Sequence, residues 1–154
     1  MNLPEAYRRH LTIALDRIVF LGLDQPVPLL SIKRGIVFIL ARWSVSSQMA
    51  FKALNAALPQ IGGVDDLCIY VADTDGIKTQ EFLSQIGETP SGGGETYWVV
   101  GGRIQHKLRG YTDKDLSSVL NFTKELAHPA ILANWNGKGD VGTGKGTEKA
   151  AEGV

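Results

Sequence analysis

The hydrophobic pattern of this chain predicts a sheet built from short strands. The apolar runs at 35–41 and 67–72 are continuous, short and rich in β-branched residues, which is typical of strands buried on both faces. Residues 95–100 and 103–108 predict a hairpin that turns at Gly101-Gly102. We therefore expect four strands, of which the last two are antiparallel.

Helical spacing of apolar residues predicts four helices around these strands. The expected ranges are 4–20, 48–58, 78–86 and 112–126, and the last begins with a capping box at 112–115. In the first range the apolar positions are Tyr7, Leu11, Ala14, Leu15 and Ile18. The predicted order is α, β, α, β, α, β, β, α, and strands separated by helices favour parallel pairing. The sequence thus predicts an α/β fold, a mixed sheet with helices on both faces.

Chain length and composition suggest one main domain. The 154 residues are 44% hydrophobic and 21% charged, which is ordinary for a globular protein. We divide the chain into an N-terminal helix and linker (1–30), a domain (31–126) and a tail (127–154). From residue 134 the chain is rich in Gly, Lys, Thr and Glu, so we expect the tail to be largely disordered.

Charge and hydropathy narrow the choice of partner and compartment. Lys plus Arg and Asp plus Glu number 16 each, so no net charge attracts nucleic acid or an anionic membrane. No apolar run is long enough to span a bilayer, and charges interrupt the N-terminal apolar residues that a signal peptide would need. We expect a cytoplasmic protein whose partner is a protein or peptide, and the oligomeric state stays open.

Metal and cofactor signals in the sequence are weak. The single cysteine, Cys68, allows no internal disulfide or multi-cysteine zinc site, and we expect it to be a small core residue. Asp73 and Asp75 are interpreted as a solvated turn because they lack the further oxygen ligands of a calcium loop. The glycine motifs at 137–142 and 139–145 are attributed to composition, because no strand precedes them. We expect no metal and no cofactor.

Several segments in the order of the chain resemble the thioredoxin family. The run Ala41-Arg42-Trp43 after a buried strand matches the family's Ala-x-Trp, and Ser44-Val45-Ser46-Ser47 follows where the family has Cys-x-x-Cys. Residues 71–75 look like the family's strand ending in Asp-x-Asp, and 97–110 look like its closing hairpin and glycine. The resemblance covers 31–126 and implies a thioredoxin-like fold with an extra N-terminal helix.

The resemblance also implies that the family's redox reaction has been lost. That reaction needs a thiolate and a resolving thiol, and serine hydroxyls have no accessible disulfide chemistry. Phe38 stands where the family often has a buried Asp, and Gly94 stands where it has a cis-proline. We expect a looser loop there, with a weaker grip on an extended peptide. The serines are interpreted as helix caps, since no histidine is predicted nearby to activate them.

The leading hypothesis is a redox-inactive binding, chaperone-like or scaffold module without catalytic residues. Its expected surface consists of Trp43, Ser44, Val45, Ser46, Ser47, Gly94 and Glu95. For Trp43 binding and packing are weighed about equally, whereas Trp98 is expected to pack in the core. One alternative is a thiol-disulfide oxidoreductase whose cysteines were replaced by serine, by nature or by engineering. Another is a purely structural remnant or oligomer subunit.

Overall fold

The strands of the protein form a single five-stranded sheet. A computed structural model describes residues 3–127. The strands are β1 (Ile18–Gly22), β2 (Arg34–Leu40), β3 (Cys68–Asp73), β4 (Thr96–Val100) and β5 (Arg103–Leu108), in the spatial order β1-β3-β2-β4-β5. β1 and β2 both pair with β3 in parallel, whereas β4 is antiparallel to β2 and to β5. The mixed sheet expected from the sequence is confirmed.

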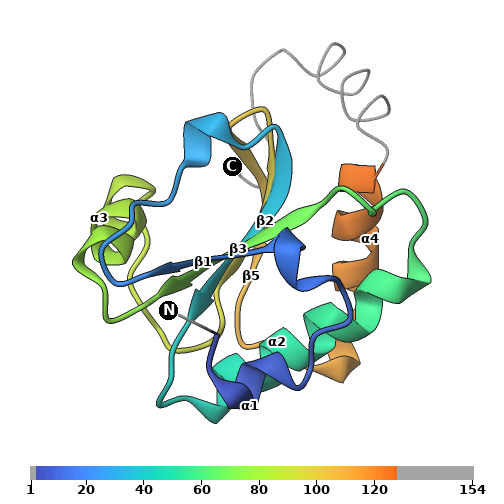
Figure 1. The fold of residues 1–154 in the computed structure, drawn as a ribbon, viewed down its shortest axis with the longest axis horizontal. Coiled ribbons are helices and arrows are strands. Elements are labelled where there is room, and N and C mark those ends of the chain that lie inside the picture. The colour runs from blue at the N-terminus through green and yellow to red at the C-terminus, as the bar shows by residue number, and fades with distance from the viewer. Residues whose placement is uncertain (1–2, 128–154) are drawn as a thin grey trace.

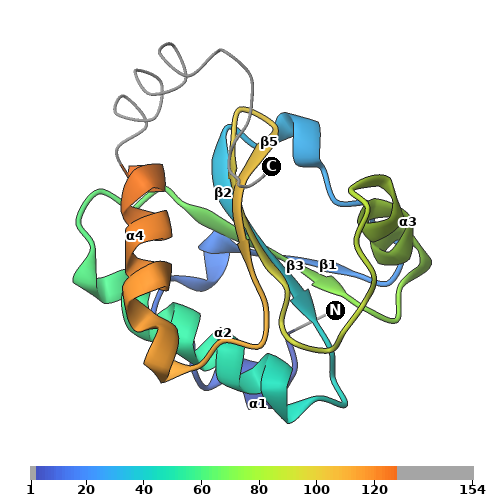
Figure 2. The ribbon, with the colours of Figure 1, turned by 180° about the vertical axis from the view of Figure 1, so that it is seen from behind.

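Helices cover both faces of this sheet, as predicted. They are α1 (Glu5–Arg8), α2 (Val45–Ala57), α3 (Ile77–Gln85) and α4 (Leu116–Ala127), with short 3-10 turns at Leu15–Arg17, Leu29–Ser31, Leu58–Gln60 and Asp113–Asp115. Figures 1 and 2 show α2 and α4 on one side of the sheet and α3 on the other. No helix among residues 3–127 is long and apolar enough to cross a membrane.

The central strand β2 is continuously apolar from Ile36 to Leu40 because both of its faces are covered. Successive side chains of a strand point to opposite faces. Ile36 and Phe38 therefore join the core beneath α2 and α4, and Val37 and Ile39 join the core beneath α3. All four side chains are fully buried. The continuous apolar run thus reflects a strand that is covered on both sides.

The single helix predicted over 4–20 is wrong in its extent. Only Glu5–Arg8 is α-helical, and Ile18–Gly22 is a strand that pairs with β3. Between them, the Thr12 amide donates to Asn55 Oδ1 (3.1 Å) and its hydroxyl donates to the Asn55 carbonyl oxygen (2.8 Å). These bonds to α2 hold the chain away from helical geometry. Leu15, expected on the buried stripe, is 65% exposed.

The segment before residue 31 contributes to the same sheet and core as the rest of the chain. β1 is an edge strand of the sheet, and the Tyr7 side chain is 1% exposed beside Phe38 and Phe51. The strand β1 is followed by a crossover to β2 that holds only the 3-10 turn Leu29–Ser31. Residues 1–30 are therefore more than a helix and linker.

The predicted start of the last helix is confirmed. Thr112 Oγ1 accepts from the Lys114 amide (3.2 Å), and Asp115 Oδ2 accepts from the Thr112 amide (3.0 Å), which is a capping box. The 3-10 turn Asp113–Asp115 that follows this capping residue leads directly into α4. The predictions for the tail and for the glycine motifs at 137–145 lie outside the described residues.

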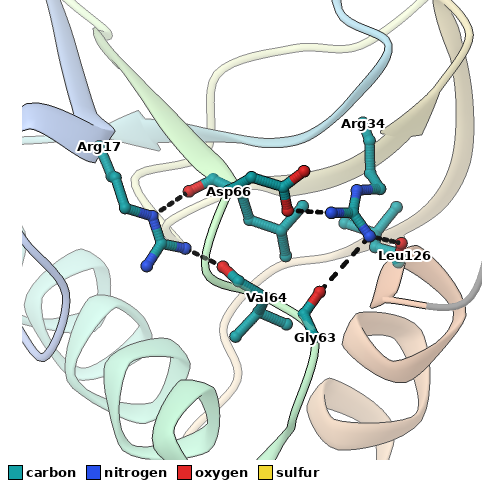
Figure 3. A network of polar contacts seen from close by, with 7 residues as sticks. Arg17, Arg34, Gly63, Val64, Asp66 and Leu126 are labelled. Atoms are coloured by element: carbon teal, nitrogen blue, oxygen red, sulfur yellow. Dashed lines mark hydrogen bonds and ion pairs between the residues drawn. The ribbon is translucent and has the colours of Figure 1, made fainter.

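Two arginines hold the connection between α2 and β3 (Figure 3). Arg17 donates to the carbonyl oxygens of Leu67 (2.7 Å) and Val64. Arg34 donates to the Leu126 carbonyl oxygen (2.9 Å) at the end of α4 and pairs with the carboxylate of Asp66. Arginine presents several donors in a fixed fork, which suits such multiple contacts. The connection and α4 are thereby fixed at the edge of the sheet where β2 begins.

Candidate functional site

The Ser44–Ser47 turn lies at the start of α2, directly after the central strand. Ser44 is the N-cap residue, with extended backbone geometry, and its Oγ accepts from the Ser47 amide (3.2 Å). Val45 is the first residue of the helix, and Ser46 and Ser47 follow in its first turn. Both sequence expectations, the position and the capping role of Ser44, are confirmed.

The two serine hydroxyls are occupied by contacts with the protein itself. Ser44 Oγ donates to the Gly92 carbonyl oxygen (2.5 Å), and the residue is only 9% exposed. Ser47 is fully buried, and its Oγ accepts from the Ala41 amide (3.1 Å) and is hydrogen-bonded to the Tyr7 hydroxyl (2.9 Å). The hydroxyls therefore join α1, α2 and the loop before β4.

Tyr7 is the residue of this site that sequence reasoning missed. Its hydroxyl donates its one proton to the Ala41 carbonyl oxygen (2.8 Å), just after β2, so the Ser47 hydroxyl is the donor in the bond between Tyr7 and Ser47. Burial raises the pKa of Tyr7 above its ordinary value, so the hydroxyl stays protonated and remains a donor. The sequence marked Tyr7 as apolar, but nothing in the local pattern indicated a partner 40 residues along the chain.

No base contacts either serine among residues 3–127. His106 stacks on Phe122 and lies 2.8 Å from Glu125 Oε1, against α4. Within residues 3–127 His10 forms no hydrogen bond with the turn, and partial burial together with Arg9 lowers its pKa. His128 lies outside the described residues. A serine nucleophile without an adjacent base is unreactive, which supports the capping interpretation.

Trp43 is a surface residue whose position depends on a glycine. Its side chain is 65% exposed, and its ring packs against Gly92, where a Cβ would come within 2.4 Å of the indole. Gly92 also has φ +74°, in the left-handed region that favours glycine. The expected core position of Trp98 is confirmed, since it is fully buried and donates to Thr123 Oγ1.

Most of the exposed large apolar side chains belong to segments at one edge of the sheet. Because β1, β2 and β3 are parallel, the residues that follow them come to the same edge. Five of the seven large exposed apolar residues in the described chain belong to segments at this edge, which we call the carboxyl-edge patch: Leu23, Trp43, Val45, Met49 and Ile77. Such gathering of exposed apolar surface is typical of interaction sites.

The glycine-rich loop before β4 is tightly held, which corrects the expectation of a looser loop. Glu95 is 3% exposed, and its Oε2 accepts from the amide (2.7 Å) and hydroxyl (2.9 Å) of Ser91. The Gly93 carbonyl oxygen accepts from the Gly110 amide (2.6 Å), and the Gly93 amide donates to Ser91 Oγ. These bonds replace the rigidity that a proline would have supplied.

Gly94 lies against the first turns of α2. Its φ is +68°, and a Cβ there would meet the Cβ of Ala50 at 2.7 Å and the ring of Phe38 at 3.1 Å. The predicted surface residues Trp43, Ser44 and Gly94 are thus brought together. Glu95 follows, but its side chain is directed to Ser91 instead of to Trp43.

Two further sequence interpretations need correction, one at each end of β3. Asp73 is not solvated: its side chain is 1% exposed, pairs with Arg42 Nε (2.7 Å) and accepts from the Asp75 amide. Cys68 is not fully buried but has intermediate exposure. It starts β3, at the edge of the sheet opposite Trp43. No group of three potential metal ligands occurs within residues 3–127.

Comparison with known proteins identifies the fold through structure alone. No family model matches the chain, and no curated protein matches its sequence. Oxidised thioredoxin O2 of Arabidopsis thaliana is 13% identical, with a TM-score of 0.55 over 71% of this chain and 96% of its own.

Two further thioredoxin structures give the same result. Oxidised mitochondrial thioredoxin 3 of Saccharomyces cerevisiae is 12% identical, with a TM-score of 0.52 over 76% of this chain and 98% of its own. Oxidised thioredoxin O1 of Arabidopsis thaliana is 14% identical, with a TM-score of 0.51 over 68% and 95%. The chain therefore has a thioredoxin-like fold, in which a serine, Ser44, caps the helix that follows the central strand.

Proposed function

We propose that this chain is a redox-inactive thioredoxin-like module that binds a protein or peptide as a chaperone-like or scaffold component. Its binding surface is the carboxyl-edge patch together with the exposed Ser46 of the turn, and the buried Ser44, Ser47 and Gly92–Glu95 loop support that surface from beneath. The observation that carries the proposal is that Trp43, Val45 and Met49, at the start of α2, leave large apolar side chains exposed, with Leu23 and Ile77 in other segments at the same edge. Burial of aromatic and aliphatic side chains supplies much of the energy of protein interfaces.

The loss of redox activity follows from the atoms at the turn. Disulfide exchange requires a thiolate, and here both positions carry hydroxyls that are already hydrogen-bonded. The only cysteine of the sequence, Cys68, lies at the opposite edge of the sheet and has no second cysteine to pair with. The absence of a second cysteine from the 154 residues supports the proposal that the module is redox-inactive.

The chemistry of the partner follows from the state of the loop. The amide and carbonyl groups of Gly93 are both used within the protein, so an extended peptide cannot pair with them without breaking existing bonds. Recognition must therefore depend on side chains. Trp43, Val45 and Met49 offer an apolar surface, and Val45 and Met49 lie one helical turn apart. We expect a partner segment that contributes apolar side chains.

The alternative function, thiol-disulfide exchange, is tested by an insulin-reduction assay. The protein with Ser44 and Ser47 is expected to give no turnover above the reductant blank, because neither position carries a thiol. The double variant Ser44→Cys, Ser47→Cys serves as the comparison. Turnover by the serine-containing protein would refute the proposal, whatever the double variant does.

A display screen with linear peptides tests the binding surface. Wild-type protein is expected to enrich peptides with apolar side chains, and Trp43→Ala is expected to weaken their affinity at least about tenfold, as for an aromatic hot spot. The matched control is Leu30→Ala, which removes an apolar side chain that is 89% exposed and precedes β2 at the opposite edge. Equal losses in both variants, or no enrichment, would contradict the proposal and favour a purely structural subunit.

A further inference from the structure

A pocket of about 330 Å³ lies beside the Gly92–Glu95 loop and outside the carboxyl-edge patch. It is lined by Glu88, Glu95, Tyr97, Lys107, Leu108 and Arg109. Its size is at the lower end of the range that small-molecule sites occupy. Only Glu95 is shared with the binding surface proposed above, so the pocket requires its own explanation.

The pairing of β4 with β5 explains how four of these side chains meet. Tyr97 lies opposite Lys107, and Thr96 lies opposite Leu108, so Glu95 comes beside Arg109 at the end of the ladder. Residues two apart on a strand share a face. Glu95, Tyr97, Lys107 and Arg109 therefore project from the same face of the sheet, the one on which Tyr97 packs with Phe82 of α3.

Tyr97 places an unpartnered donor in the pocket. The residue is 1% exposed, and its hydroxyl makes no hydrogen bond with any described residue. Within the described chain, Thr79 Oγ1 is the only side-chain polar atom that is both shielded from solvent and without a hydrogen-bond partner. The Tyr97 hydroxyl also has no partner among residues 3–127, so it must still be accessible to solvent. Burial raises the pKa of Tyr97, which keeps the hydroxyl protonated. A protonated phenol in this position can donate to an acceptor supplied by a ligand.

Among the charged groups that line the pocket, one cationic group and one carboxylate oxygen have no partner within the described chain. Lys107 Nζ is already paired with Glu88 Oε2 at 2.5 Å. Arg109 is exposed and forms no ion pair with a described residue. Glu95 uses Oε2 for both bonds to Ser91, whereas its Oε1 accepts none from the described chain. The open groups are thus a guanidinium, a carboxylate oxygen and a phenol.

We propose that this pocket binds a small zwitterion of the α-amino acid type. Its carboxylate would accept from the Tyr97 hydroxyl and pair with Arg109, and its ammonium group would pair with Glu95. A dianionic phosphate fits less well, because two carboxylates line the same space and like charges repel. Binding in this pocket does not depend on the proposed peptide-binding surface.

Titration with three matched probes, followed by amide chemical shifts, tests the charge pattern. L-leucine is expected to give saturable shifts at the lining residues. L-leucinamide lacks the carboxylate, and N-acetyl-L-leucine lacks the ammonium charge, so each is expected to bind at least about tenfold more weakly. Binding of N-acetyl-L-leucine as tight as that of L-leucine would reduce the pocket to a simple anion site. That result, or no saturable shift with L-leucine, would overturn the proposal.

Three variants assign the contacts. Tyr97→Phe removes only the unpartnered hydroxyl, and Glu95→Gln keeps an oxygen for Ser91; both are expected to fold and to weaken L-leucine binding about tenfold. Arg109→Gln should do the same, whereas Arg103→Gln, at the other end of β5, is the control with the same charge change. Unaltered binding in both Tyr97→Phe and Arg109→Gln would contradict the assignment. Trp43→Ala should leave this binding unchanged, which separates the pocket from the peptide surface.

Discussion

A fragment that begins at residue 31 is expected not to fold, although the sequence places the start of the domain there. It would lack β1, which exposes the edge of β3, and it would lack Tyr7, whose ring fills the space beside Phe38 and Phe51. Unpaired strand edges and large cavities are both destabilising. Amide chemical-shift dispersion and thermal unfolding measure the outcome, and a cooperative transition in the fragment would restore the boundary at residue 31.

Point variants separate the contribution of Tyr7 from that of the strand. Tyr7→Ala is expected to lower the free energy of unfolding by about 3–5 kcal/mol, as for other buried aromatics. Tyr7→Phe keeps the ring but removes the hydroxyl that is hydrogen-bonded to Ala41 and Ser47, which is expected to lower the free energy of unfolding by about 1–3 kcal/mol. The control is Tyr70→Phe, since that hydroxyl bonds to no described residue. Equal effects of the two Phe variants in urea denaturation would show that the Ser47 contact contributes nothing.

Installing the family's proline at position 94 is expected to unfold or severely destabilise the protein. Proline fixes φ near about −65°, whereas Gly94 has φ +68°. Even Gly94→Ala should cost about 2–4 kcal/mol, because left-handed backbone strain adds to the contact with Ala50 Cβ at 2.7 Å. Chemical denaturation measures both effects.

Two other glycines provide matched controls for Gly94. Gly101 also has a positive φ (+58°), but a Cβ there would meet nothing within 4 Å, so Gly101→Ala should show the backbone strain alone. Gly62 has neither problem, and Gly62→Ala is expected to be neutral or slightly stabilising. If Gly94→Ala cost no more than Gly101→Ala, the packing of this loop against α2 would have to be looser than described.

The elements that could be predicted from the sequence are those whose local pattern permits one solution. The run at 35–41 is too short for a helix, and its apolar residues would lie on both faces of a strand. Most of this run forms β2 (Arg34–Leu40). The segment 4–20 permitted two solutions, because its apolar spacing also fits a helix. Its outcome depended on β3, since Ile18 pairs with Ile69, about 50 residues away. No local pattern contains that partner.

The site divides in the same way. The capping role of Ser44 follows from neighbours in the chain. The exposure of Trp43 does not follow from them, since the local pattern fits binding and packing equally and the ring rests on Gly92. The tightness of the loop does not, because it depends on Gly110 meeting Gly93. The burial of Asp73 likewise depends on Arg42, which belongs to a different strand connection. Such contacts become visible only when the sheet order is known.

The hydrogen bond from Ser44 to Gly92, together with the packing of the Trp43 ring on that glycine, has a consequence for the thermodynamics of recognition. Ordering a mobile receptor surface upon binding costs entropy for each side chain and loop that is immobilised. Here that ordering is completed during folding. A segment bound as proposed would lose its own conformational freedom, but the protein would lose little, so even a modest contact area would suffice to hold the segment.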